Sequence, residues 1–126
     1  MKYLFLILFI SFHLHSQNSN EKTVSTSIIK LISNPEQFNN KPIRIIGFLH
    51  LEFEGNAIFL HKEDFENRNN QNAFYLILPS KLEEQIIKEK ANNSYISLTG
   101  IYKMNQHGHL GLWPGEIIVE SIEKIK

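Results

Sequence analysis

The segment from residue 42 to residue 54 constrains the fold of this chain more than any other part of the sequence. Its side chains alternate, so that every odd-numbered position carries an apolar residue or Gly47 on one side. In the first half, Ile46 and Phe48 make the other side apolar as well, whereas the second half is polar there. The pattern predicts one long strand, and Gly47 near its middle predicts a bend or a bulge.

The segments on either side of this strand predict a helix and a hairpin. Apolar residues at helical spacing predict a short helix over residues 27–33, which should stop before Pro35. Gly55-Asn56 predicts a two-residue hairpin turn, followed by a returning strand over residues 57–62. The asparagine-rich stretch 62–71 is expected to be a solvated loop.

Three further strands are predicted in the second half of the chain, at residues 73–78, 95–104 and 116–125. A helix lies between the first and second of them. Ser80 and Glu83 fit a capping box at its start, Leu82 and Ile86 share its buried face, and Asn92-Asn93 should end it. The stretch 105–115 is expected to be a loop rich in glycine and histidine.

The predicted order is strand, strand, strand, helix, strand, strand, with a short helix in front. This order, with a long bent first strand, is typical of the five-stranded OB-fold barrel, a mainly β class. The barrel domain is expected to cover residues 26–126, preceded by a flexible polar leader over residues 18–25. No internal repeat or second domain is indicated.

The first 17 residues have the features of a cleavable signal peptide. Lys2 is followed by an apolar run over residues 3–14, which is shorter than the ~20 residues that a membrane-spanning helix needs. Cleavage is expected after Ser16 or Gln17, giving an exported protein, periplasmic or secreted. Because the chain contains no cysteine, it has neither a lipid-modified cysteine nor disulfides, and we expect no stable membrane anchor after cleavage.

The charge of the exported chain argues against a nucleic-acid partner. Removing Lys2 with the signal leaves 12 basic against 13 acidic residues, and no dense Lys/Arg cluster occurs. Proteins that bind nucleic acid generally carry a basic excess, because neutralising phosphates supplies much of their affinity. The expected partner is therefore an unidentified small ligand or another protein.

Several stretches resemble an uncharacterised family of small exported bacterial OB-fold proteins. They are Asn34-Pro35-Glu36, Asn40 to Gly47, His50 to Asn56, and His107 to Leu112. The resemblance implies the barrel fold and export, and it implies no activity.

Four histidines remain after signal cleavage, and they fall in two segments of the predicted barrel: His50, His61, His107 and His109. A two-residue turn at Gly55-Asn56 places His50 opposite His61, Glu52 opposite Phe59 and Glu54 opposite Ala57. The other face of this hairpin is then apolar and buried, through Leu49, Leu51, Phe53, Ile58 and Leu60.

OB barrels bind ligands between the first hairpin loop and the loop joining the last two strands, so the histidines and Glu52 are expected to approach one region. Imidazole and carboxylate together suit a zinc-type divalent metal. The alternative is that these side chains are solvated or make structural hydrogen bonds, and the sequence alone leaves both open.

Aromatic residues offer a second kind of site. Trp113, Tyr102, Tyr75 and Phe59 could form a stacking platform for an oligosaccharide or single-stranded nucleic acid, although most aromatics of a small barrel belong to its core. Catalysis finds little support, because there is no cysteine nucleophile, no G-x-S-x-G motif and no phosphate-binding glycine loop.

The first hypothesis is therefore a non-enzymatic binding module that uses the first hairpin and the 105–115 loop, with Glu52, Glu54, Tyr102 and Trp113 as ligand-binding residues. A metal-binding protein or metal-assisted hydrolase, and a glycan- or nucleic-acid-binding protein, are the alternatives.

Overall fold

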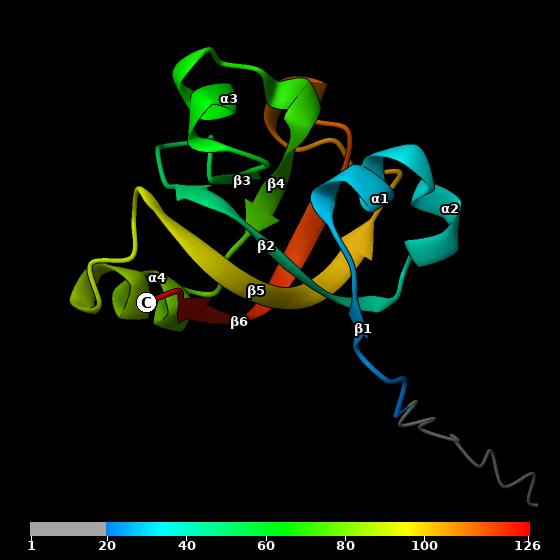
Figure 1. Cartoon of the computed structure of the whole chain (residues 1–126), viewed down its shortest axis with the longest axis horizontal. Coiled ribbons are helices and arrows are strands. Elements are labelled where there is room, and N and C mark those ends of the chain that lie inside the picture. Colours follow the sequence, from blue (N-terminus) through cyan, green and yellow to red (C-terminus); the bar gives the residue numbers. More distant parts are fainter. Residues whose placement is uncertain (1–19) are drawn as a thin grey trace, which may run out of the picture.

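The computed structural model describes residues 20–126, so the predicted signal peptide and the first two leader residues lie outside it. Within this range, five strands close into a barrel and a short sixth strand is added at one edge (Figure 1). The barrel strands are β2 (Pro42–His50), β3 (Ala57–Phe59), β4 (Ala73–Ile77), β5 (Ser94–Lys103) and β6 (Glu116–Lys124). The added strand is β1 (Val24–Ser25).

The strand pairing makes the barrel OB-fold-like. The order around it is β2-β3-β4-β6-β5, and β5 returns to pair with β2 and close the sheet. These pairs are antiparallel except for β4 with β6, which run parallel. The mainly β, OB-fold-like class predicted from the order of elements is therefore confirmed.

The end of the predicted leader is not loose. Val24 and Ser25 form β1, which pairs in parallel with Ile43 and Arg44 of β2. The backbone N–H of Thr26 continues the pairing by donating to the carbonyl of Arg44 at 2.9 Å. The sequence prediction missed this strand because its side chains are exposed and carry no apolar alternation.

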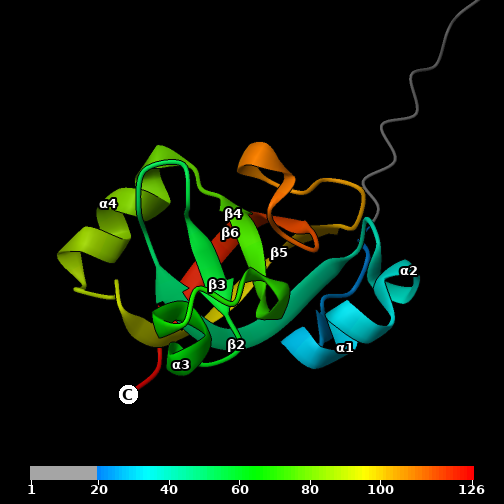
Figure 2. The ribbon, with the colours of Figure 1, turned by 90° about the horizontal axis from the view of Figure 1, so that it is seen from above.

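The helices α1 (Ile28–Ser33) and α4 (Ser80–Lys88) lie at opposite ends of the barrel (Figure 2). The hydroxyl of Ser27 caps α1 by accepting from the Lys30 N–H at 3.2 Å. α4 buries Leu82 and Ile86 as predicted, and α1 buries Ile28 and Leu31, whereas Ile32 at the same helical spacing is exposed. A single turn, α2 (Pro35–Phe38), follows α1 and buries Phe38.

The ends of α4 differ from the prediction. Pro79 occupies the N-cap position and Ser80 is the first helical residue, so no side chain caps this helix. The fixed φ angle of proline suits the extended conformation at the N-cap position. Pro79 therefore precedes the helix without a capping hydrogen bond from its side chain. The helix ends at Lys88, earlier than Asn92-Asn93, because Lys90 takes a left-handed conformation (φ 53°).

The barrel interior is filled by side chains from all five strands and from both end helices. Its buried apolar residues are Ile28, Leu31, Phe38, Ile43, Ile45, Leu49, Ile58, Phe74, Leu76, Leu82, Ile86, Ala91, Ile96, Leu98, Tyr102, Ile117, Val119 and Ile122. Every odd position of β2 from Ile43 to Leu49 is buried, as the alternation predicted.

Gly47 allows close packing and does not form a bulge. The pairing of β2 with β5 runs without a shift from Pro42 to Leu49. A Cβ at position 47 would lie 2.6 Å from the Phe59 carbonyl oxygen and 2.9 Å from Cδ1 of Ile28. The missing side chain therefore lets β3 and α1 approach β2 closely.

The first hairpin is wider than predicted. β2 ends at His50 and β3 begins at Ala57, and these two residues face one another, so His61 is not the partner of His50. The chain turns early because Glu54 is left-handed (φ 55°) and the Gly55 N–H donates to the Glu52 carbonyl at 3.1 Å. Phe53, predicted to be buried, is 91% exposed.

Candidate functional site

Two loops meet beside the barrel and form the candidate site. Residues 51–56 connect β2 to β3, and residues 105–115 lie between β5 and β6. Nε2 of His109 lies 3.1 Å from Oε2 of Glu54, so an ion pair joins the two loops when the imidazole is protonated. We call these two stretches, without the buried Trp113, the loop rim, and their approach is the one that the barrel order predicted.

The 51–56 loop is held by hydrogen bonds from its neighbours and from itself. The Leu51 N–H donates to Oδ1 of Asn92 at 2.9 Å, and the Glu52 N–H donates to Oδ1 of Asn56 at 3.1 Å. The carbonyl of Asn56 accepts from the Leu76 N–H of β4 at 2.8 Å. The loop therefore has a fixed conformation in which Phe53 points away from the barrel.

The 105–115 loop is closed at its base by His107. The Nδ1–H of His107 donates to the Trp113 carbonyl at 3.0 Å, and the Trp113 N–H donates back to the His107 carbonyl at 3.2 Å. Between them, η2 (His109–Gly111) forms a tight turn in which Leu110 is left-handed (φ 56°). Leu110 is 79% and Leu112 50% exposed, so this loop also presents apolar side chains to solvent.

His50 lies at the end of β2 and is mostly covered. Its Nδ1 is 2.6 Å from Oδ1 of Asn93, and its ring stacks on Phe65 with a centroid separation of 3.9 Å. Its Nε2 is 3.7 Å from a carboxylate oxygen of Glu52. His50 therefore joins the loop rim to the turn before β5, where Asn93 adopts a left-handed conformation (φ 57°).

His61 precedes a helix that the sequence analysis predicted as loop. The stretch contains α3 (Lys62–Glu66) and η1 (Asn70–Asn72). Asp64 organises both, since its carboxylate accepts from the His61 N–H at 3.1 Å and from the side-chain amides of Asn69 and Asn72 at 3.1 and 3.0 Å. Two of the asparagines that suggested a solvated loop, Asn69 and Asn72, are instead donors to this half-buried carboxylate.

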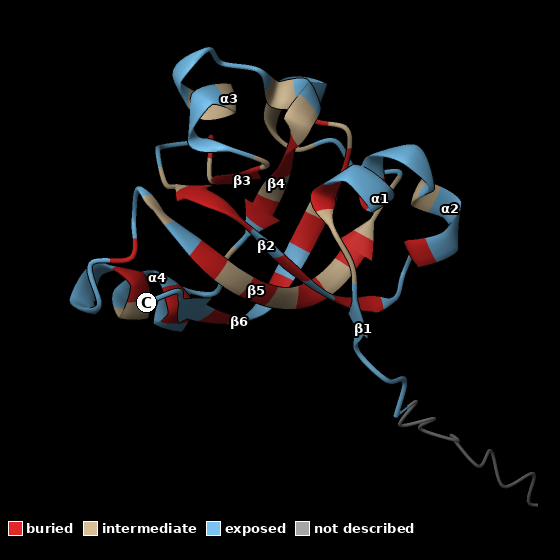
Figure 3. Cartoon of the chain, in the orientation of Figure 1, coloured by how far each residue is buried: buried red, intermediate tan, exposed pale blue. Residues whose placement is uncertain are grey.

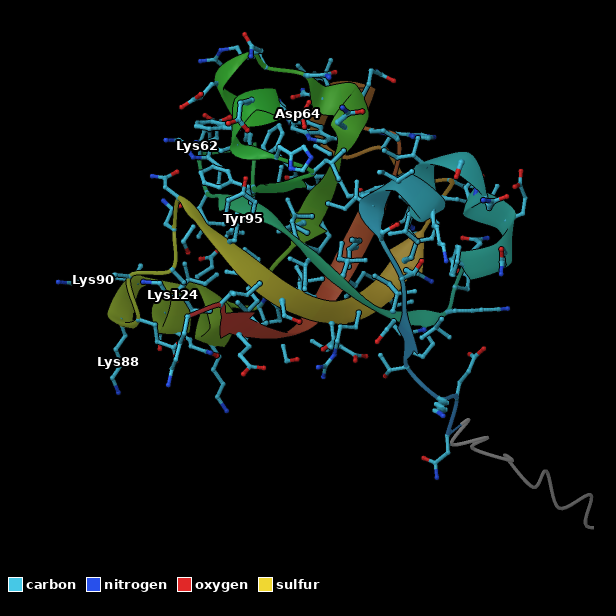
Figure 4. The ribbon with its side chains drawn as sticks, in the orientation of Figure 1. Lys62, Asp64, Lys88, Lys90, Tyr95 and Lys124 are labelled. Atoms are coloured by element: carbon cyan, nitrogen blue, oxygen red, sulfur yellow. The ribbon has the colours of Figure 1, made fainter. Side chains whose placement is uncertain are left out.

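α3 is fastened to the barrel wall from two sides. The Lys62 N–H donates to the Tyr95 hydroxyl of β5 at 3.1 Å, and Figure 4 shows this tyrosine beneath α3. Phe65 packs against Phe48 and Phe59, with ring centroids 5.8 and 5.6 Å away. The helix therefore covers part of the outer face of β2 and β3.

The four histidines take part in separate local contacts. His50 and His109 each approach a different glutamate, His107 closes its own loop, and His61 precedes α3. Among residues 20–126, no three His, Asp or Glu side chains come close enough to hold a metal ion together. The proposed convergence on a zinc-type ion is thus not seen in the described part of the chain.

Tyr102 belongs to the barrel core rather than to a surface platform. It is 1% exposed, and its ring meets Phe74 edge-on at 5.4 Å. Burial raises the pKa of its hydroxyl to about 12, with a smaller contribution from the negative charge of Glu36. A surface ligand does not reach Tyr102, so its expected role in ligand binding does not fit its position.

Trp113 is also covered from solvent, and it belongs to a second apolar cluster, which lies on the outer surface of the barrel. We call this cluster the aromatic layer: Phe48, Phe59, Phe65, Tyr75 and Trp113, with Ala57 and Ala73 beneath them. Trp113 is 7% exposed and packs on Tyr75 with ring centroids 5.0 Å apart. Because of this layer β3 is buried on both faces (Figure 3).

The aromatic layer occupies the surface that OB barrels commonly use for ligands. That surface is the outer face of the second and third barrel strands, here β3 and β4, between the two rim loops. In this chain it is filled by the protein's own side chains. The loop rim therefore remains as the part of the usual binding region that still exposes apolar residues.

Comparisons with known proteins identify no family for the chain. It matches no protein-family model, and no curated protein sequence matches it. None of the helices formed by residues 20–126 is long and apolar enough to cross a membrane.

Proposed function

We propose that the chain is an exported, non-enzymatic OB-fold module that binds a partner through its loop rim. The observation that carries this proposal is that two ordered loops, joined through Glu54 and His109, present Phe53, Leu110 and Leu112 to solvent. The usual ligand face beside them is covered by the aromatic layer.

An ordered loop with exposed apolar side chains is well suited to binding. Burying one aromatic side chain removes roughly 150 Å² of apolar surface from water, worth about 4 kcal/mol before the cost of association. Because hydrogen bonds already fix the 51–56 loop, little conformational entropy is lost when Phe53 is covered. Phe53 is thus the expected anchor of the rim.

The residues near the rim support a binding role better than a catalytic one. His50 and His109 each pair with a glutamate, and among residues 20–126 no three His, Asp or Glu side chains come close enough to hold a metal ion. Metal-dependent turnover of an ester or glycan that disappears in His109→Ala would overturn the non-enzymatic assignment.

Export rests on the sequence of residues 1–17. Intact mass and N-terminal sequencing of the protein from the cells that produce it should give a chain that begins near Asn18. A protein that keeps Met1 and remains inside the cell would contradict export while leaving the binding proposal intact.

Because the chain contains no cysteine, single-cysteine variants allow a direct test of binding. A photo-crosslinker on Leu110→Cys should capture a partner, whereas the same group on Ile46→Cys should not. Ile46 is the matched control, since it is also exposed but lies on the outer face of β2 away from the rim.

Competition makes this test specific. Excess unlabelled wild-type protein should abolish the Leu110 cross-link, and a Phe53→Ser/Leu110→Ser/Leu112→Ser variant should compete poorly. Cross-links of equal yield from both positions, or no competed product at all, would contradict the binding module.

A further inference from the structure

A groove lies between the 51–56 loop and α4. It has a volume of about 410 Å³ and is lined by Leu51, Glu52, Phe53, Glu54, Asn56, Glu83 and Ile87. Figure 2 shows the loop rising beside α4. The groove thus has one wall from a fixed loop and one from a helix packed on the barrel core.

The apolar part of the lining is unusually open to solvent. Phe53 is 91% and Ile87 74% exposed, while Leu51 is partly buried against the core. Two large, mostly exposed apolar side chains that line one groove favour an apolar group of a partner. Neither side chain belongs to a buried apolar cluster, and α4 packs on the core through Leu82 and Ile86 instead.

The charged part of the lining has a single sign. Its charged residues are Glu52, Glu54 and Glu83, and no lysine or arginine lines the groove. Protonated His50 and His109 can balance Glu52 and Glu54 from outside the groove, whereas Glu83 of α4 makes no ion pair within the described residues. Phosphate, nucleic acid and anionic lipid are therefore disfavoured, and a cation beside the apolar group is favoured.

We infer that this groove takes a basic, apolar peptide segment of a protein partner, with an aliphatic or aromatic side chain between Phe53 and Ile87 and a Lys or Arg beside Glu83. The inference rests on the proposed function, because it uses the same 51–56 loop, and it adds the chemistry of the partner. Apolar contact supplies most of the affinity, and the carboxylates select the sign of the charge.

Fluorescence anisotropy with short synthetic peptides tests the inference on the purified protein. A peptide that alternates Lys and Leu should bind, whereas peptides that alternate Glu with Leu, or Lys with Ser, should bind at least about tenfold more weakly. Equal binding of the Glu-Leu peptide, or no binding of the Lys-Leu peptide below about 1 mM, would overturn the inference.

Variants locate the binding in the groove. Phe53→Ser should weaken Lys-Leu binding about tenfold or more, and Glu83→Gln roughly threefold with a smaller dependence on salt. Glu84→Gln is the matched control on α4, since Glu84 is exposed but does not line the groove, and it should change nothing. Binding that is unchanged in Phe53→Ser, or lost equally in Glu84→Gln, would place the peptide elsewhere and contradict the inference.

Two further outcomes separate this inference from the proposed function. If the peptides fail while the Leu110 cross-link remains position-specific, the partner chemistry is wrong and the binding module stands. If sedimentation shows a dimer that Phe53→Ser abolishes, the groove is occupied by a second copy of the chain, which also overturns the peptide assignment.

Discussion

The aromatic layer and the loop rim contain similar side chains in opposite environments. In the layer, Phe65 and Trp113 come from two connecting segments and fold back onto β3 and β4. In the rim, Phe53 and Leu110 also come from connecting segments, but local hydrogen bonds and left-handed residues turn them outward. The chain therefore covers the common ligand face of the barrel with its own side chains, and leaves apolar side chains exposed at the edge of that face.

The largest expected difference between the two regions is in stability. Trp113→Ala removes a side chain that is 7% exposed and should lower the free energy of unfolding by about 3 kcal/mol or more. Phe53→Ala should change it by less than about 0.5 kcal/mol, because that ring contacts mainly solvent. Urea unfolding followed by circular dichroism checks both. Equal losses of free energy would mean that Phe53 stabilises the fold as much as Trp113 does.

A glycine substitution tests how the two regions are joined. Gly108 has φ 65° and ψ −163°, and a Cβ there would lie 2.4 Å from the Tyr75 ring. Gly108→Ala should therefore destabilise the protein by about 2 to 3 kcal/mol. Gly111→Ala is the control, since it is also left-handed (φ 68°) but has open space around it, and should cost about 1 kcal/mol. A loss in Gly108→Ala no larger than in Gly111→Ala would show that the loop does not pack on the layer.

The pH dependence of stability tests whether the barrel core beneath the aromatic layer excludes solvent as the layer does. The pKa of Tyr102 is about 12 in the folded protein and about 10 in an unfolded chain, so the unfolded chain ionises first as the pH rises. The stabilising effect is therefore complete below pH ~10 and falls by about 1 to 2 kcal/mol as the pH approaches 12.

Urea unfolding at about pH 9 and about pH 11.5 measures this loss, and Tyr102→Phe should remove it. The variant corrects for the titration of other groups at high pH, because it retains all of them. A wild-type loss that Tyr102→Phe leaves unchanged would show that this hydroxyl is not protected by burial.

The smallest expected effect belongs to the contact that joins the rim loops. Glu54 and His109 are both partly exposed, so a double-mutant cycle on Glu54→Gln and His109→Ala should give a coupling below about 1 kcal/mol in stability. The coupling should shrink as salt is added. A value several times larger would mean that the rim depends on this pair far more than its exposure indicates.

The barrel could be predicted from the sequence because its strands alternate and its turns are marked. The register of the first hairpin could not. The structure pairs His50 with Ala57, and the prediction paired it with His61, a displacement by an even number of residues. Such a displacement leaves every side chain on the same face of the sheet, so alternation cannot detect it. The left-handed conformation of Glu54 decides the register, and a glutamate at this position does not predict that conformation.

The sequence located the candidate site only in part. The approach of the two loops follows from the order of the strands, and Glu54 and His109 meet. The partners of His50 and His107 were not foreseen, because an amide and a backbone carbonyl across a turn leave no periodic signal. α3 was hidden by its asparagines and by its unusual cap, in which the Asp64 carboxylate accepts from the N–H of His61 in place of the common Ser/Thr and Glu/Gln pair.

The contact between Glu54 and His109 can form only late in the synthesis and folding of the chain. One loop follows the first barrel strand, and the other precedes the last, so the chain must be almost entirely synthesised and folded before the two can meet. A partner that touches both loops therefore recognises only molecules whose barrel has closed. On an exported chain, the rim would act as a mark of completed folding, because truncated or half-folded copies lack it.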